Sequence, residues 1–245
     1  MQIDATNMHY RELNQEIRRA VAAGETKFEL LNVNGQRYIG DGLQGGLEID
    51  IHGVPGNDLG AFMNGPTIRV HGNAQDAVGN TMNAGRIIVH GHAGDVLGYG
   101  MRWGELLVRG NVGYRVGIHM KAYREMRPVL IAGGTAGDFL GEYMAGGVLI
   151  VLGMDRQPGE PLVGHWCGTG MHGGEIYLRG EVEGGRIATQ SVGVRPVSEA
   201  EGEQLRPYLE AFCAEFDRDL EELTAEPFFR VGPLSHRPYG AKYAA

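Results

Sequence analysis

One short motif recurs along most of the chain at a nearly constant interval, and this repeat constrains the fold more than any other feature. The motif is Gly-x-x-Met. Its first four copies follow one another at a constant interval of about 19 residues, and the last two follow at longer intervals. Most copies are followed by a small turn and a short apolar strand that ends in glycine, as in residues 86–91. Repeats of this length indicate a fold built from stacked, equivalent units. The motif residues are Gly60, Met63, Gly79, Met82, Gly98, Met101, Gly117, Met120, Gly141, Met144, Gly168 and Met171.

The length of the repeat distinguishes among repeat architectures. A unit of about 19 residues is too short for a propeller blade and lacks the leucine pattern of a leucine-rich repeat. It fits one coil of a β-helix, in which strands of successive coils pair at about 4.8 Å. Residues 47–53 are a degenerate first copy, with Leu43 in place of methionine. The sequence therefore predicts an all-β fold, a single-stranded right-handed β-helix of about seven coils with flanking N- and C-terminal helices.

The repeat also explains an unusual composition. Glycine accounts for 41 of the 245 residues, a share well above the roughly 7% of an average protein. A sharp corner that recurs once per coil needs a residue that tolerates a positive φ, which glycine does without a steric penalty. We therefore expect the motif glycines, together with Gly147 and Gly174, to mark the corners, and the methionines to stack as an internal ladder.

Alternation along each strand predicts which side chains face the core. The outward positions are polar in the early coils and apolar in the later ones, and an apolar stripe of this kind needs a cover. The expected outward apolar residues are Ile88, Leu107, Leu130, Ile150 and Tyr177. The expected inward residues are Ile68, Val70, Ile87, Val89, Leu106, Val108, Leu149, Val151, Ile176 and Leu178.

The C-terminal segment has the pattern of the required cover. Residues 198–201 form a capping box, and apolar residues follow at helical spacing over residues 205–223. Pro207 is expected to break this stretch into two helical pieces. Much of the tail from 227 to 245 shows no regular pattern.

A helix at residues 10–22 is expected to shield the opposite end of the stack, because an uncapped β-helix end is an adhesive edge. The predicted organisation is an N-terminal helix and capping segment at 1–40, the β-helix at 41–190, and a C-terminal helical segment and tail at 191–245 that packs on the β-helix.

Three histidines, His52, His71 and His90, occupy equivalent places in consecutive coils, one repeat apart. Such a column could bind a metal ion or form a solvated polar ladder. We favour the polar ladder, because the side chains are expected to face outward and no carboxylate is evident beside them. The next coils carry Arg109 and Ala132 at this place. The sequence therefore predicts no metal site in this chain.

Asp76, Asp95 and Asp138 also repeat. A calcium-binding β-roll needs a nine-residue glycine–aspartate repeat, which this spacing does not match. We therefore expect these aspartates to form turns in which the carboxylate bonds its own backbone.

Residues 164–174 contain His165, Cys167 and His172, which could serve as metal ligands or as a Cys–His pair. The segment is one repeat unit with a longer lead-in, and no orienting Asp or Asn is evident. The Gly-x-Gly pieces are corners rather than a dinucleotide-binding fingerprint. Gln2 stands where a terminal-nucleophile amidotransferase needs Cys, Ser or Thr. The sequence thus predicts no catalytic and no cofactor-binding residues.

The charge and cysteine content exclude further classes. The net charge of −8 argues against nucleic acid as a partner. There is no basic, apolar leader, and the longest apolar run, near residues 148–152, is far shorter than the roughly 20 residues of a membrane helix. Two cysteines, Cys167 and Cys213, are too few for a disulfide framework or for a four-cysteine zinc or iron–sulfur site. We expect a cytoplasmic protein.

The repeated corners, such as residues 141–147, and the strand that follows resemble the C-terminal β-helix domain of glutamate synthase large subunits, which is named for its GXGXG repeats. The chain is more similar still to the stand-alone, archaeal version, found where the large subunit is split into separate polypeptides. One departure is Trp103, which stands where the paired glycine of a corner is expected. The specific stretches of the resemblance are 9–14, 35–40, 79–83, 113–120 and 235–240.

This resemblance implies a non-catalytic structural subunit of glutamate synthase, an oxidoreductase complex of nitrogen metabolism that makes glutamate from glutamine and 2-oxoglutarate. In such enzymes an amidotransferase hydrolyses glutamine, and ammonia passes inside the protein to a flavin unit that holds FMN and an iron–sulfur cluster. The implied partners are a glutamine amidotransferase subunit and an FMN-dependent synthase subunit, with no cofactor in this chain.

Other assignments stay open. Similar β-helices are subunits of formylmethanofuran dehydrogenase, of formyltransferase–hydrolase complexes and of N-methylglutamate synthase-like complexes. An enzyme in its own right would use residues 164–174 with His119 or the histidine column. A self-assembling homo-oligomer without catalytic partners is a third alternative.

Overall fold

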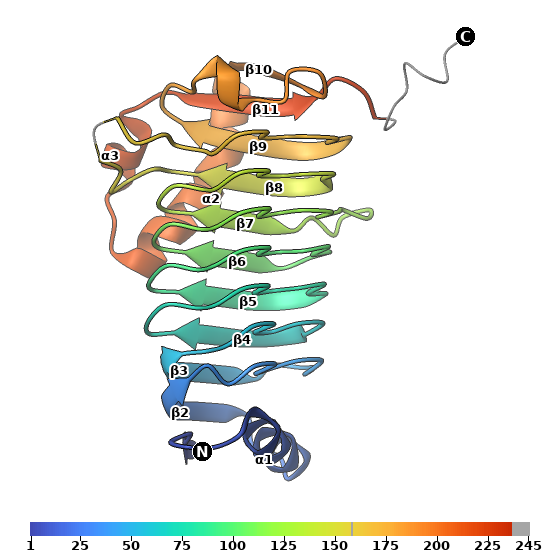
Figure 1. Cartoon of the computed structure of the whole chain (residues 1–245), viewed down its shortest axis with the longest axis vertical. Coiled ribbons are helices and arrows are strands. Elements are labelled where there is room, and N and C mark those ends of the chain that lie inside the picture. The colour runs from blue at the N-terminus through green and yellow to red at the C-terminus, as the bar shows by residue number, and fades with distance from the viewer. Residues whose placement is uncertain (158, 237–245) are drawn as a thin grey trace.

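The computed structural model describes residues 1–157 and 159–236, which form a single stack of coils (Figure 1). Their strands join one eleven-stranded sheet with the order β1-β2-β3-β4-β5-β6-β7-β8-β9-β11-β10. The strands are β1 (Gln2–Asp4), β2 (Lys27–Asn34), β3 (Glu48–Val54), β4 (Asn64–Val70), β5 (Ala84–Val89), β6 (Glu105–Val108), β7 (Val129–Ala132), β8 (Ala145–Val151), β9 (Gly173–Arg179), β10 (Val192–Pro196) and β11 (Phe228–Pro233). The helices are α1 (Tyr10–Ala22), the 3₁₀ helix η1 (Gly184–Arg186), α2 (Glu199–Phe216) and α3 (Leu220–Thr224).

The strands from β1 to β9 pair in parallel in chain order, so each strand from β1 to β8 is bonded to the strand that follows it. Ile68 of β4, for example, pairs with Ile49 of β3 on one side and with Ile87 of β5 on the other. Within the described residues, the seven strands from β3 to β9 bound six turns of chain. The predicted β-helix is confirmed. The parallel ladder begins within residues 1–40, because β1 and β2 already belong to it.

The interior of the stack consists of columns of equivalent apolar side chains. The six motif methionines are at most 2% exposed, and all ten residues predicted to face inward are buried in the same central cluster. Apolar side chains at equivalent positions, one strand spacing apart, pack continuously, so each coil is stabilised by the coils above and below it.

The prediction that Leu130 faces outward is wrong. Leu130 pairs with Leu106 and Leu149 and lies in the central core, whereas Ile131 faces outward. Leu106 and its equivalent Leu130 are 24 residues apart, whereas Ile87 and Leu106 are 19 apart, so the constant interval does not fix the register of β7. The predicted register was wrong by one residue, and a one-residue slip exchanges the two faces. For the same reason Ala132 pairs with Val108 and does not continue the column of Arg109.

A second apolar cluster lies outside the sheet, where α2 covers the later strands (Figure 1). Leu205, Leu209, Phe212 and Phe216 of α2 are buried there. Their partners on the sheet are Ile88, Leu107, Val129, Ile131, Val148, Ile150 and Tyr177. The predicted cover is thus confirmed, including its capping box, in which Ser198 and Glu201 each accept a backbone hydrogen bond from the other.

The predicted break at Pro207 is wrong, because α2 continues through this residue and ends at Asp217, which has a φ of 52°. Burial of one face of α2 against the sheet offsets the roughly 3 kcal/mol that an internal proline costs a helix. The tail is also more regular than expected: β11 pairs antiparallel with β9 and with β10, and β10 is the last strand at this end of the sheet. Residues 237–245 lie outside the described part of the chain.

Helix α1 covers the N-terminal end of the stack, as predicted (Figure 1). Its buried residues are Leu13 and Ile17, which belong to the central core, and its first turn carries a capping box between His9 and Glu12. The first coil is therefore not left as an open end.

Each corner bends through alternate residues in the left-handed region. In one coil these are Phe139, Gly141 and Tyr143, with φ of 61°, 66° and 51°. The motif glycine always takes the middle place, because a Cβ on Gly141 would lie 2.5 Å from Cδ1 of Ile176 in the next coil. The flanking places accept large side chains, such as the exposed Phe62 and Trp166. Glycine is thus required for space inside the corner and not only for φ.

Candidate functional site

The histidine column forms a continuous stack of rings on the outer surface. The ring centroids of His52 and His71 are 4.6 Å apart, those of His71 and His90 are 5.5 Å apart, and each pair is tilted by 13°. The edge of the stack meets Phe216 at the end of α2, 5.3 Å from His90. The column therefore runs from solvent to the border of the helix-covered face.

Carboxylates accompany this column, contrary to the sequence expectation. Nε2 of His52 lies 3.4 Å from Oε1 of Glu29, and Nε2 of His71 lies 2.9 Å from Oδ1 of Asp50. Burial, followed by the charge of His71, lowers the pKa of His90. Each carboxylate serves one ring, and across the described residues no group of three or more His, Cys, Asp or Glu side chains could hold a metal ion. The arrangement is a stack of imidazole rings in which His52 and His71 each contact one carboxylate of the preceding coil.

Residues 164–174 do not bring a nucleophile and a base together. Cys167 is fully buried in the central core, and desolvation raises the pKa of its thiol to about 12. The backbone amide of His165 donates to Asp138, and Nδ1 of His172 lies 3.2 Å from the carbonyl of Gly170. A thiol that stays protonated and inaccessible is a packing group rather than a nucleophile.

The repeated aspartates bond the next coil and not their own backbone, which corrects the sequence prediction. Oδ1 of Asp76 accepts from the amide of Asp95 at 2.9 Å, and Oδ1 of Asp95 accepts from the amide of Tyr114 at 2.8 Å. A second column runs beside it through Asn73, His92 and Asn111, whose side chains accept from the amides of His92, Asn111 and Thr135. These bonds hold successive coils in register. The sequence signal for these bonds between coils was the recurrence of the same residues once per repeat.

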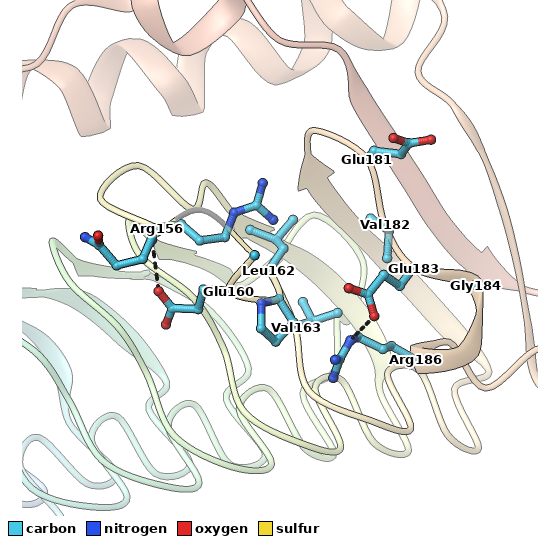
Figure 2. A pocket seen from close by; sticks show the side chains of 12 residues that line it. Arg156, Glu160, Leu162, Val163, Glu181, Val182, Glu183, Gly184 and Arg186 are labelled. Carbon is cyan, nitrogen blue, oxygen red and sulfur yellow. Dashed lines mark hydrogen bonds and ion pairs between the residues drawn. The ribbon is translucent and has the colours of Figure 1, made fainter.

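One surface cavity of about 660 Å³ lies where the longest coil passes residues 181–186 (Figure 2). Figure 2 shows Leu162 and Val163 between the side chains of Arg156 and Arg186. Arg186 is paired with Glu183 at 2.8 Å, so part of the charged lining is satisfied internally. No sequence pattern indicated this cavity, and its described lining contains no Cys, Ser, Thr, His or Lys side chain.

Exposed aromatic side chains gather in the corner segments, outside every strand, which the sequence analysis also missed. Trp and Tyr are enriched at protein–protein interfaces, because they bury a large area while losing little side-chain freedom. The set comprises Phe62, Tyr99, Trp103, Tyr114, Tyr123 and Trp166, each at least 40% exposed.

Comparison with known proteins agrees with this architecture. The sequence model described as the GXGXG motif matches residues 11–230. An uncharacterized protein of Methanocaldococcus jannaschii is 49% identical over 249 residues, covering 98% of this chain and 95% of that protein. Among the described helices, none has the length and apolar character needed to cross a membrane.

Proposed function

The chain belongs to the GXGXG motif family, and on that basis we propose that it is a non-catalytic structural subunit of a split glutamate synthase. In this proposal it holds a glutamine amidotransferase subunit and an FMN- and iron–sulfur-containing synthase subunit at a fixed separation. The chemistry belongs to those partners, which convert glutamine and 2-oxoglutarate into glutamate. The β-helix itself is like the C-terminal domain of glutamate synthase.

One observation supports a binding role most directly: exposed aromatic residues lie along the corners of a rigid stack. The stack is rigid because its core columns are continuous and because Asp and Asn side chains bond one coil to the next. A surface that must hold two proteins in a set geometry needs a rigid frame and large anchoring side chains. The corner segments combine both.

The rival assignment is a β-helix subunit of a formylmethanofuran dehydrogenase, formyltransferase–hydrolase or N-methylglutamate synthase-like complex. It shares the repeat and the exposed corners. Residues 35–40 and 235–240 favour the glutamate synthase type by their resemblance, although 237–240 lie outside the described residues. The two assignments differ in the partners bound and in the carbon substrate used.

The test is to purify this chain together with the glutamine amidotransferase and FMN-dependent synthase polypeptides of the same organism. Glutamine-dependent formation of glutamate from 2-oxoglutarate is then measured with and without this chain. We expect ammonia-dependent activity of the flavin polypeptide to persist without the chain and glutamine-dependent activity to fall at least tenfold. Turnover of glutamine by this chain alone, or coupling that is unchanged without it, would reject the proposal.

A further inference from the structure

The regular stack is interrupted by a hairpin that projects between β6 and β7 (Figure 1). The interval from Met120 to Met144 is longer than the interval from Met101 to Met120, which matches the regular repeat. The additional length includes a tight turn closed by two backbone hydrogen bonds of 3.0 Å between Tyr123 and Met126. Both side chains are exposed, so the insertion adds surface without adding to the core.

Trp103, the residue that departs from the corner pattern, lines a cavity with this hairpin. The cavity measures about 510 Å³ and lies between four separate parts of the chain. The start of β5 forms one part, residues 103–105 at the start of β6 supply Trp103 and Glu105, the hairpin and the residues after it supply Glu125 and Arg127, and α2 supplies Tyr208. Trp103 at a corner and the hairpin inserted one coil later therefore line the same cavity.

Some of the charged residues that line this cavity have a partner of opposite charge, and one does not. Arg127 is bonded to Glu175, and Glu105 lies 2.9 Å from Arg86. Within the part of the chain that the structure describes, Glu125 has neither an ion-pair partner nor a hydrogen bond. The basic residue of the lining is therefore already neutralised, and one carboxylate remains available beside an indole ring that is 47% exposed.

We propose that this cavity is a docking socket for an arginine side chain on a loop of a partner protein. A guanidinium group stacks on the face of a tryptophan and forms two parallel hydrogen bonds to a carboxylate, and the socket offers both groups. The exposed Tyr123 and Met126 would contact the loop around that arginine, as aromatic and methionine side chains do in interfaces. The inference rests on the proposed role as a subunit and adds where, and by what chemistry, one partner is held.

The first test uses the free chain and a defined probe. The protein contains two tryptophans, so Trp166→Phe leaves Trp103 as the only indole reporter. We expect N-acetyl-arginine methylamide to change its fluorescence saturably. The citrulline analogue, which is of similar shape and uncharged, should bind at least fivefold more weakly, and Glu125→Gln should weaken the arginine probe equally. Glu160→Gln, at the other cavity, is the matched control and should have no effect. The socket is rejected if the arginine and citrulline probes bind equally well. It is also rejected if the arginine probe binds Glu125→Gln as tightly as it binds the parent protein.

The second test uses the assembled complex with the amidotransferase and flavin polypeptides. Trp103→Ala and Glu125→Arg should each weaken binding of one partner at least tenfold, while the control variant Glu160→Arg binds as the parent does. Unchanged melting temperatures establish that the variants fold.

If the parent chain forms the complex and both socket variants match it, the socket is rejected while the subunit role stands. If the parent chain forms no complex, the subunit role is rejected and the probe titration decides the socket. A dimer of this chain that Trp103→Ala dissociates would assign the socket to a second copy and reject the partner assignment.

Discussion

The first coils and the later coils share one backbone and one interior but differ on the outer face of the sheet. One register column runs through Glu29, Asp50, Arg69, Ile88, Leu107, Ile131, Ile150 and Tyr177. Its first three residues are charged and meet solvent or ion pairs, and the rest are apolar and meet α2. The fold of a coil is thus set by its inward side chains and corners, and its outward side chains decide what it binds.

The border between the two regions is marked by charge. Glu215, near the end of α2, lies 3.6 Å from Arg69 and 3.2 Å from Arg86, and the next residue of the helix, Phe216, contacts His90. Asp217 then ends the helix in a left-handed conformation. The C-terminal end of the helix therefore lies at the edge of the apolar part of the face.

The largest effect should come from breaking the covered region. Phe212 is fully buried between α2 and the sheet. Phe212→Ala should lower the free energy of unfolding by about 3–5 kcal/mol, because it removes an aromatic ring and leaves a cavity. Urea denaturation measures this, and Asp50→Ala on the uncovered coils is the control, with an expected change of about 0.5 kcal/mol or less. A loss below about 1 kcal/mol for Phe212→Ala would mean that α2 is not an integral part of the fold.

A corner substitution should affect both regions alike, because the interior is the same in each. Gly60→Val in the first coils and Gly141→Val in the later coils should each destabilise the protein by roughly 1–3 kcal/mol. In both, the new Cβ meets Cδ1 of an isoleucine in the next coil, at 2.6 and 2.5 Å. Gly42→Ala is the matched control, because its φ is also positive but no atom lies within 4 Å of the added Cβ. Normal thermal stability of both valine variants would contradict the packing of the corners.

The border itself is tested by Glu215→Gln. Removing the charge weakens two ion pairs, one to Arg69 of β4 and one to Arg86 of β5, and we expect a loss of roughly 1 kcal/mol. Glu210→Gln on the exposed side of α2, where Glu210 forms an ion pair with Arg206, should change stability by less than about 0.5 kcal/mol. Chemical denaturation at low and high salt measures both variants, and an equal response of the two would show that Glu215 does not fix the end of the helix.

The smallest effect concerns pH. Because the pKa of His90 is lowered in the folded chain, the unfolded chain takes up its proton at higher pH than the folded chain does. The contribution of His90 to the free energy of unfolding is complete above a pH of about 6.5, the ordinary pKa of histidine. It is lost as the pH falls through the pKa that His90 has in the folded chain. His90 is partly exposed, so the loss between pH 7.5 and pH 5.5 should be on the order of a few tenths of a kcal/mol. His90→Gln should flatten this part of the pH profile, and an unchanged profile in that variant would assign the effect to other groups.

The repeat period was sufficient to predict the fold because one constant spacing determines corners, inward columns and parallel pairing together. The prediction was wrong at the places where the chain departs from the constant spacing. The longer coil before β7 moved Leu130 from the predicted outer face to the core. Strand β11 returns antiparallel, and no local pattern distinguishes this pairing from an irregular tail. The packing that tolerates Pro207 is tertiary, so no local rule could have shown it.

The candidate site was less accessible to sequence reasoning than the fold. The histidine column was found by its spacing, but its carboxylate partners lie in neighbouring coils, about one repeat away in the chain. Trp103 was noticed only as a departure from a corner pattern. Its association with Glu125 and Tyr208 depends on a hairpin and a helix whose positions the period does not describe.

Because successive coils are equivalent, adding or removing one coil changes the length of this molecule by a fixed amount. Deleting residues 83–101 would join Met82 to Arg102 and leave the methionine column unbroken. Each such deletion would shorten the stack by one strand spacing of about 4.8 Å. A protein of this kind can therefore serve as a ruler: the distance between surfaces at its two ends is counted in whole coils, and evolution can adjust that distance by duplicating or removing one unit.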